Sequence, residues 1–272
     1  MSSPQAAARV IEVFPSIQGE GIHVGKPHLF VRFWNCNLAC AYCDTDYRGP
    51  YREMTPEGLS EEVEQHLRDD GPFHAVSLTG GEPLLWASFL KRWLPWLRGK
   101  GQTVYLETNG TLPDALEQVL PWVDIIAMDV KPPSATADRP VWAEHERFLR
   151  IAWEASQRPA PVPHPGDRYQ VPNHSLVPGT DPPSGTWYRS RPEVFVKVVV
   201  TPGTADDEVA RAAALIAEVD RGIPLVLQPV TPWGGVSEMP SAEQVARWRR
   251  LAGRELTNVR VLPQVHRLLG VR

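Results

Sequence analysis

The sequence has few cysteines, no surplus of positive charge and no long hydrophobic run. Its 272 residues include three cysteines, 28 basic and 32 acidic side chains, and the net charge at pH 7 is −4. This acidic balance disfavours a nucleic-acid partner. No apolar run reaches the ~18 residues that a membrane-spanning helix needs, and the N-terminus lacks the pattern of a signal peptide. We therefore expect a cytoplasmic protein that binds neither membranes nor nucleic acid.

The three cysteines lie together in the stretch CNLACAYCDT, as Cys36, Cys40 and Cys43, with the spacing C-x3-C-x2-C. An odd number argues against a disulfide framework, and a reducing cytosol leaves thiols free for metal or redox chemistry. A structural zinc site needs a fourth ligand, for which His23 or His28 is available, and a catalytic zinc site needs only three. A cluster of four irons normally takes four thiolates, so three would leave one iron open to another ligand.

Extended and helical patterns alternate along the chain, which predicts parallel β/α units with their chemistry at the carboxyl ends of the strands. Strands are expected at 9–14, 28–34, 74–80, 102–110 (with its turn), 123–130, 194–200, 223–230 and 258–262. Helices are expected at 55–70, 86–98, 204–219 and 241–252. Thr55 and Thr204 are the expected N-caps of two of them, and Ser241 with Gln244 forms a capping box.

One segment breaks this alternation. Residues 132–192 contain twelve of the 28 prolines, and their second half has no regular period. So long a connection inside a compact domain is unusual. We therefore expect a single domain over 1–272 with a proline-rich insertion at 135–192.

The sequence TGGEP (79–83) follows a predicted strand and resembles the GGEP motif of the radical S-adenosylmethionine superfamily, whose cysteine spacing the chain also shares. Glycine lets the backbone come close to a ligand, and Glu82 adds a carboxylate. The resemblance implies a 4Fe–4S cluster on the three cysteines. It also implies that S-adenosylmethionine binds the open iron and is cleaved by an electron from the cluster to a 5′-deoxyadenosyl radical.

Further motifs narrow the resemblance. SIQGEG (16–21), Arg32, CDT (43–45), TGGEP and the tail VLPQVHRLLG (261–270) together resemble the 7-carboxy-7-deazaguanine synthases, which serve the pathway to queuosine and related 7-deazapurines. The similarity covers 9–134 and 194–270. It implies an incomplete, modified (β/α)6 barrel, a homodimer, and an electron donor such as flavodoxin or ferredoxin.

The implied reaction converts 6-carboxy-5,6,7,8-tetrahydropterin to 7-carboxy-7-deazaguanine. The ring contracts, ammonia is lost, and S-adenosylmethionine is used catalytically. This is a carbon–nitrogen lyase reaction. Two alternatives remain at this stage: a glycyl-radical activating enzyme, which would act on a protein, and a non-enzymatic metal-binding module.

The resemblance also assigns residues to ligands. The predicted substrate residues are Ile17, Gln18, Gly19, Glu20, Arg32 and Thr79. The predicted S-adenosylmethionine residues are Tyr42, Cys43, Asp44, Gly81, Glu82, Thr108, Asn109, Asp129, Val130, Lys131 and Gln228. The family usually has Ser-Pro-Lys where this chain has Asp129, Val130 and Lys131.

A magnesium ion is also implied. By the resemblance its ligand is Thr45, although chemistry alone would favour the carboxylates of Asp44 and Asp46. His266 in the tail is expected to be a packed residue that orders the C-terminus. Trp34 is expected to shield the cysteine loop from water.

Overall fold

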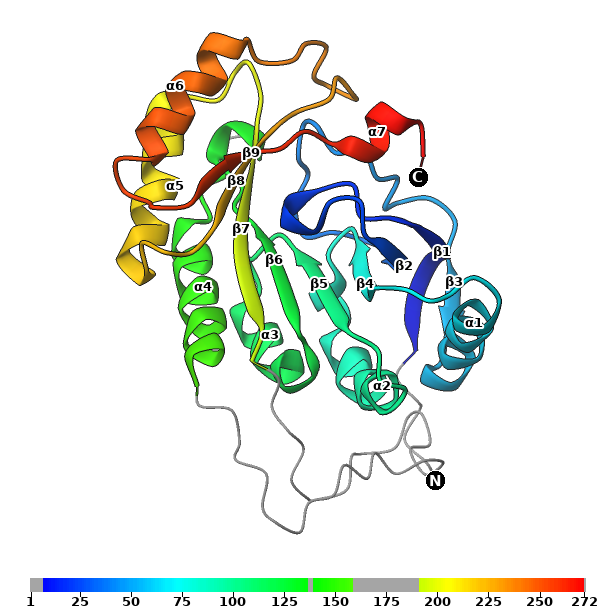
Figure 1. Ribbon diagram of the computed structural model, residues 1–272. Coiled ribbons are helices and arrows are strands. Elements are labelled where there is room, and N and C mark those ends of the chain that lie inside the picture. Colours follow the sequence, from blue (N-terminus) through cyan, green and yellow to red (C-terminus); the bar gives the residue numbers. More distant parts are fainter. Residues whose placement is uncertain (1–6, 137–138, 159–190, 272) are drawn as a thin grey trace.

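The structure is a computed structural model that describes residues 7–136, 139–158 and 191–271. One nine-stranded sheet runs through the described residues in the order β3-β1-β2-β4-β5-β6-β7-β8-β9 (Figure 1). The strands are β1 (Ala8–Ile17), β2 (Pro27–Phe33), β3 (Arg52–Met54), β4 (Ala75–Gly80), β5 (Val104–Thr108), β6 (Ile125–Asp129), β7 (Glu193–Val200), β8 (Leu225–Pro229) and β9 (Val259–Val261).

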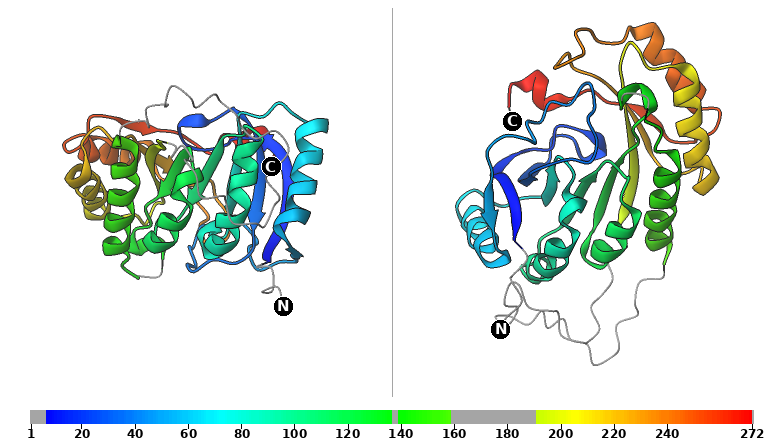
Figure 2. Two further views of the ribbon diagram at one scale, coloured as in Figure 1. Left: turned by 90° about the horizontal axis from the view of Figure 1, so that it is seen from below. Right: turned by 180° about the vertical axis from the view of Figure 1, so that it is seen from behind.

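From β2 to β9 each neighbouring pair of strands is parallel, whereas β1 is antiparallel to both β2 and β3. The edge strands β3 and β9 do not pair with each other, so the sheet stays open. The helices α1 to α6 lie along one face of the curved sheet, and α7 lies beyond its carboxyl end (Figure 2). This arrangement confirms the expected incomplete β/α barrel.

The helices are α1 (Pro56–Asp69), α2 (Ala87–Gly99), α3 (Pro113–Val119), α4 (Trp142–Gln157), α5 (Asp206–Val219), α6 (Ala242–Ala252) and α7 (Val265–Leu269). The Thr55 hydroxyl accepts a hydrogen bond from the Gly58 amide at 3.2 Å and caps α1, as expected. The capping box of Ser241 and Gln244 at α6 is also confirmed.

The predicted cap of α5 is wrong by one residue. The N-cap of α5 is Ala205, whose amide donates to the Glu208 carboxylate at 3.0 Å. The Thr204 hydroxyl instead accepts a hydrogen bond from the Thr201 amide at 2.9 Å and closes the preceding turn. The Glu208 carboxylate in the first turn thus binds the amide of the N-cap residue, and its negative charge also suits the positive end of the helix dipole.

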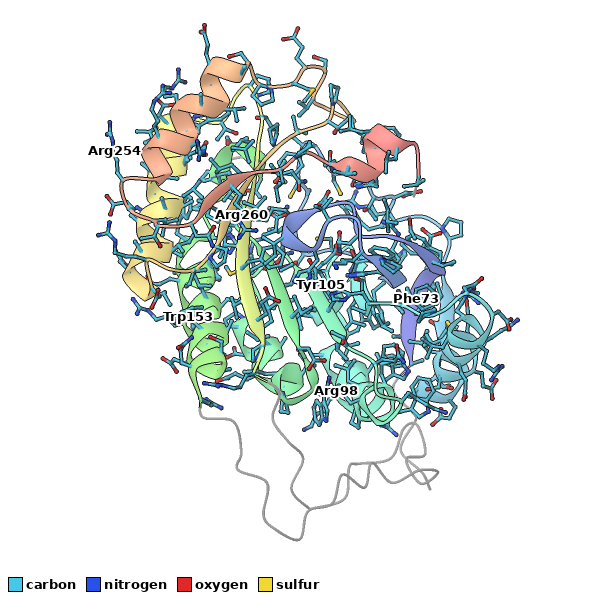
Figure 3. The ribbon with its side chains drawn as sticks, in the orientation of Figure 1. Phe73, Arg98, Tyr105, Trp153, Arg254 and Arg260 are labelled. Atoms are coloured by element: carbon cyan, nitrogen blue, oxygen red, sulfur yellow. The ribbon has the colours of Figure 1, made fainter. Side chains whose placement is uncertain are left out.

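Strand β7 shows how the sheet separates core from site. Val194, Val196 and Val198 belong to the large core between the sheet and the helices. Phe195 points the other way, into a smaller cluster with Tyr105 of β5, which Figure 3 marks near the centre of the molecule. Because successive side chains of a strand point to opposite faces, residue 197 is also placed inside the barrel.

Among the strands and α-helices, four were not predicted from the sequence, namely β3, α3, α4 and α7. Helix α4 lies within the segment that was expected to be an insertion. Its buried residues include His145, Phe148, Leu149 and Ala152, at positions i, i+3, i+4 and i+7 of one helix face, and the last three belong to the large core. Residues 142–157 therefore belong to the β/α framework, while the proline-rich residues 159–190 lie outside the described part. In the described ranges, no helix is both long and apolar enough to span a membrane.

Candidate active site

A cavity of about 490 Å³ opens at the carboxyl ends of the parallel strands. The β1–β2 connection, the cysteine loop, the ends of β4 to β8 and the C-terminal segment contribute to its wall. The predicted site residues that line it are Ile17, Gln18, Gly19, Glu20, Arg32, Cys36, Cys40, Tyr42, Cys43, Asp44, Thr45, Thr79, Gly81, Thr108, Asn109, Asp129, Lys131 and Gln228. Two predicted residues, Glu82 and Val130, do not line it.

The three cysteines share this cavity as free, half-buried thiols. The Leu38 amide lies 3.4 Å from the Cys36 sulfur, and Asn109 Nδ2 lies 3.7 Å from the same sulfur. Burial raises the pKa of the Cys36 thiol to about 11, so its thiolate needs a cationic partner. In the described part of the chain, no three His, Cys, Asp or Glu side chains are arranged around a single ion.

The two histidines considered as zinc ligands lie elsewhere. His28 and His23 stack on either side of His74, with ring centroids 5.5 and 5.3 Å away. His28 Nδ1 is 2.7 Å from the Ser77 hydroxyl, and His23 pairs with Glu193 at 3.1 Å. Neither histidine lines the cavity. A tetrahedral zinc site completed by one of them is therefore not supported.

The glycines of TGGEP allow the end of β4 to pack directly on the cysteine loop. A Cβ atom on Gly81 would lie 1.9 Å from the Asn35 carbonyl oxygen, and one on Gly80 would lie 2.2 Å from the Phe33 carbonyl oxygen. The Glu82 amide donates to the Asn35 carbonyl at 2.9 Å. The motif thus fixes the position of the loop that carries the thiols, a role that its sequence alone does not reveal.

Glu82 has a different place from the one predicted. Its side chain is fully buried, and its two oxygens accept hydrogen bonds from the Leu84 amide (3.0 Å), the Thr108 hydroxyl (2.9 Å) and the Asn109 amide (2.7 Å). Its carboxylate is therefore a brace between the TGGEP turn and the end of β5. Asn109 in turn donates to the Asn37 side chain at 2.8 Å, which extends the brace to the cysteine loop.

The tripeptide that departs from the family pattern divides between two faces. Val130 is fully buried in the core, which explains why it does not reach the cavity. Asp129 and Lys131 both face the cavity, and their side chains form an ion pair of 2.7 Å. Lys131 Nζ also lies 3.3 Å from the Tyr42 hydroxyl, so this pair joins the end of β6 to the cysteine loop.

Gln228 of β8 has a buried polar side chain suited to binding a ligand. The side chain is fully buried, it lines the cavity, and neither its amide oxygen nor its amide nitrogen has a hydrogen-bond partner in the protein. Leaving a buried polar group unpaired costs about 1–3 kcal/mol. An adenine edge offers the complementary donor and acceptor, so the residues present fit S-adenosylmethionine at this wall.

The opposite wall carries the predicted substrate residues. Gln18 Nε2 and the Thr79 hydroxyl both donate to the carboxylate of Glu107, at 2.7 and 3.0 Å. Burial raises the pKa of Glu107 above its ordinary value. Glu107 was not predicted as a site residue, although it opens a polar stretch at the end of a predicted strand.

Glu20 also has an unexpected partner. Its carboxylate forms an ion pair with Lys197 of β7 and accepts a hydrogen bond from Gln264 Nε2 at 2.8 Å. Lys197 lies 3.4 Å from the Asp129 carboxylate as well. Neither Lys197 nor Gln264 was predicted, because a single lysine within VFVKVVV gives no signal of its own.

Arg32 faces the cavity between two protein partners. Its Nε pairs with Glu12 at 2.9 Å, and its Nη1 donates to the Thr45 hydroxyl at 3.0 Å. The guanidinium also lies over the Phe14 ring, 5.2 Å from its centroid. It is therefore held with its planar fork in the wall, in a position suited to an anionic group.

The C-terminal helix closes one side of the cavity. The Val265 amide donates to the Gly19 carbonyl at 2.9 Å, and a Cβ atom on Gly19 would lie 1.9 Å from His266 Nδ1. Arg267 pairs with Asp44 at 2.9 Å and lies over the Trp233 ring, 4.5 Å from its centroid. The tail thus connects the predicted substrate loop to the cysteine loop.

Comparisons with known proteins concern the chain as a whole rather than single site residues. Residues 33–156 match the family model of the radical SAM superfamily. The chain is 36% identical over 292 aligned positions to the 7-carboxy-7-deazaguanine synthase of Geobacter sulfurreducens, with 99% of each chain covered. It is 34% identical over 278 positions to that of Methanothermobacter thermautotrophicus, with 97% of this chain and 98% of the relative covered.

Among solved structures, QueE from Escherichia coli matches with a TM-score of 0.54 and 16% identity, covering 96% of this chain and 95% of that one. At that identity the likeness concerns the fold alone. The near full-length similarity to the curated relatives goes further: this chain belongs to the 7-carboxy-7-deazaguanine synthase family of the radical S-adenosylmethionine superfamily.

Proposed function

We propose that this protein converts 6-carboxy-5,6,7,8-tetrahydropterin to 7-carboxy-7-deazaguanine, with ring contraction and release of ammonia. The observation that carries the proposal is that predicted cluster, cofactor and substrate residues line one and the same cavity. Three free thiols lie on it together with the unpartnered amide of Gln228 and a second, carboxylate-rich side around Glu20 and Glu107.

The cysteines would hold a 4Fe–4S cluster through Cys36, Cys40 and Cys43. Such a cluster supplies the single electron that cleaves S-adenosylmethionine and begins radical chemistry. The hydrogen bonds from the Leu38 amide and Asn109 Nδ2 to the Cys36 sulfur would stabilise the thiolate form of that ligand.

On the other side, the chain's own residues bind and orient the pterin. Arg32 offers a bidentate fork to the substrate carboxylate. Gln18, Glu20 and Glu107 present carboxylate and amide groups to a pterin edge, which has alternating donors and acceptors. The C-terminal helix excludes water from this side by packing its His266 against Gly19.

Magnesium fits this arrangement less well. The Thr45 hydroxyl accepts a hydrogen bond from the Arg32 guanidinium at 3.0 Å, which places a cation where the ion would have to bind. The Asp44 carboxylate is paired with Arg267. A magnesium ion on Thr45 stays a prediction from the family, and we derive no step from it.

Other parts of the proposal rest on the family resemblance. A homodimer, a flavodoxin or ferredoxin as electron donor, and a cytoplasmic location stay predictions. Glycyl-radical activation and a purely metal-binding role are not favoured, because the full-length relatives are synthases with a small-molecule product.

The experiment is anaerobic incubation of the iron-reconstituted protein with the carboxytetrahydropterin, S-adenosylmethionine, Mg²⁺ and dithionite. We expect the deazaguanine product and ammonia in equal amounts, with little net 5′-deoxyadenosine. A Cys40→Ala variant is the matched control and should give neither product. Absence of the deazaguanine from fully reconstituted protein would refute the proposed function.

A further inference from the structure

Lys197 lies where the two sides of the cavity meet. From β7, at the inner face of the sheet, its ammonium group pairs with Glu20 of the β1–β2 connection and approaches Asp129 of β6 to 3.4 Å. The three side chains are between 13% and 20% exposed. This lysine therefore connects the predicted substrate loop to the predicted S-adenosylmethionine side through two partly desolvated contacts.

The two carboxylates differ in how much they depend on this lysine. Asp129 keeps a second cation, because Lys131 Nζ lies 2.7 Å from the same oxygen. Among the described residues, Lys197 is the one cation that forms an ion pair with Glu20, whose other oxygen accepts a hydrogen bond from the neutral amide of Gln264 at 2.8 Å. Loss of the Lys197 charge would thus affect Glu20 more than Asp129.

The charged and titratable groups that face Glu20 come from three elements. Lys197 comes from β7, His266 from α7, and Tyr105 and Glu107 from β5. Burial opposes the ionisation of Glu20, but the nearby Lys197 outweighs it, and the pKa of Glu20 falls to about 2. Glu107 is itself a carboxyl group, so whether ionised or neutral it supplies no positive charge that could stabilise the Glu20 carboxylate in place of Lys197.

On the basis of the proposed function, we propose that Lys197 is a positioning residue for the pterin. It holds the Glu20 carboxylate in the cavity wall, with both oxygens fixed, so that their remaining lone pairs can accept hydrogen bonds from ring N–H groups of the substrate. In this arrangement the pterin contacts Glu20, and Lys197 acts through it.

The test compares Lys197→Met, which keeps the length without the charge, with Lys197→Arg, which keeps the charge. Pterin binding is measured by calorimetry on the cluster-loaded, unreduced protein with S-adenosylmethionine present, so that no turnover occurs. Without Lys197 the Glu20 carboxylate is no longer held in place, so the pterin should lose its hydrogen bonding to that charged group. Lys197→Met should therefore weaken pterin binding about tenfold to a hundredfold. Lys197→Arg should stay within about fivefold, and exposed Lys91→Met should leave binding unchanged.

Three further results separate positioning from a general loss of structure. S-adenosylmethionine binding to Lys197→Met should change by less than about threefold, because Asp129 retains its other lysine. In a Glu20→Gln background, Lys197→Met should change pterin binding by less than about twofold, since the group it positions is already altered. Below about pH 6.5 the Lys197→Met protein should lose pterin affinity that the wild type keeps, because an unpaired buried Glu20 takes up a proton.

An equal loss of pterin and S-adenosylmethionine binding, or an equal loss with and without Glu20→Gln, would overturn the positioning role. So would full pterin affinity in Lys197→Met. If Lys197→Met does not fold, Lys197→Gln gives the same comparisons. A wild type that does not bind the pterin would refute the proposed function itself, which keeps the two failures distinguishable.

Discussion

Acid should destabilise this protein through His28, at the start of β2. The side chain is fully buried, and burial together with the neighbouring His74 and His23 lowers its pKa from 6.5 to about 3. The folded state therefore binds fewer protons than the unfolded state between these two values. Stability contributed by the neutral imidazole is complete above pH 6.5 and is lost as the pH falls toward 3.

The size of the effect follows from the pKa difference, because each unit corresponds to about 1.4 kcal/mol. His28 alone should cost about 2 kcal/mol of unfolding free energy at pH 5 and about 4 kcal/mol near pH 3. Replacing it with phenylalanine removes this term. The replacement also removes the 2.7 Å hydrogen bond to Ser77, which should cost about 1–2 kcal/mol at neutral pH.

Urea denaturation followed by tryptophan fluorescence measures this directly on wild type and His28→Phe. At neutral pH the variant should be less stable, and the two stability curves should converge near pH 5. Ser77→Ala is the control, since it removes the same hydrogen bond but keeps the buried imidazole, so its stability should still fall as the pH falls from 7 to 5. Parallel curves for wild type and His28→Phe from neutral pH to pH 5 would refute the reasoning.

Three other changes test the site. Glu82→Ala leaves three buried donors without an acceptor, so it should lower the unfolding free energy measured in urea by on the order of 3 kcal/mol and lower the iron content after reconstitution. Wild-type values of both would contradict the role of Glu82 as a brace of the cysteine loop. Gln228→Leu removes no protein hydrogen bond, so stability should hold or rise, while S-adenosylmethionine binding should weaken about tenfold or more; unchanged binding would exclude Gln228 from that site. Arg267→Ala breaks a partly exposed ion pair with Asp44 that contributes less than about 1 kcal/mol to stability, so its main effect should be a severalfold higher KM for the pterin. An unchanged KM would show that the C-terminal segment does not position the residues of the cavity wall.

The framework was predictable because its signals are local. Alternating strand and helix patterns, the cap at Thr55 and the capping box at Ser241 depend on residues a few positions apart. The same is true of the thiol spacing. Helix α4 was missed because it stands next to a proline-rich stretch, and α7 because five residues with no buried side chain carry no amphipathic pattern.

The Glu82 brace and the ion pairs of Lys197 with Glu20 and Asp129 depend on residues that are distant in sequence. Glu82 was expected to face a ligand, yet its carboxylate accepts hydrogen bonds from Thr108 at the end of β5 and from the Asn109 amide that follows it. Lys197 lies 177 positions from Glu20 and appears in sequence as one polar residue within a buried strand. Only the register of parallel strands brings such side chains to one cavity, and that register is not encoded in any single motif.

Electron paramagnetic resonance of the reduced protein, combined with iron analysis, tests the assignment most directly. We expect about four irons per chain, as a cluster of this type requires, and a spectrum that changes when S-adenosylmethionine is added, because one iron has no protein thiolate. One zinc per chain in place of iron, or a cluster whose spectrum does not respond to S-adenosylmethionine, would contradict the account.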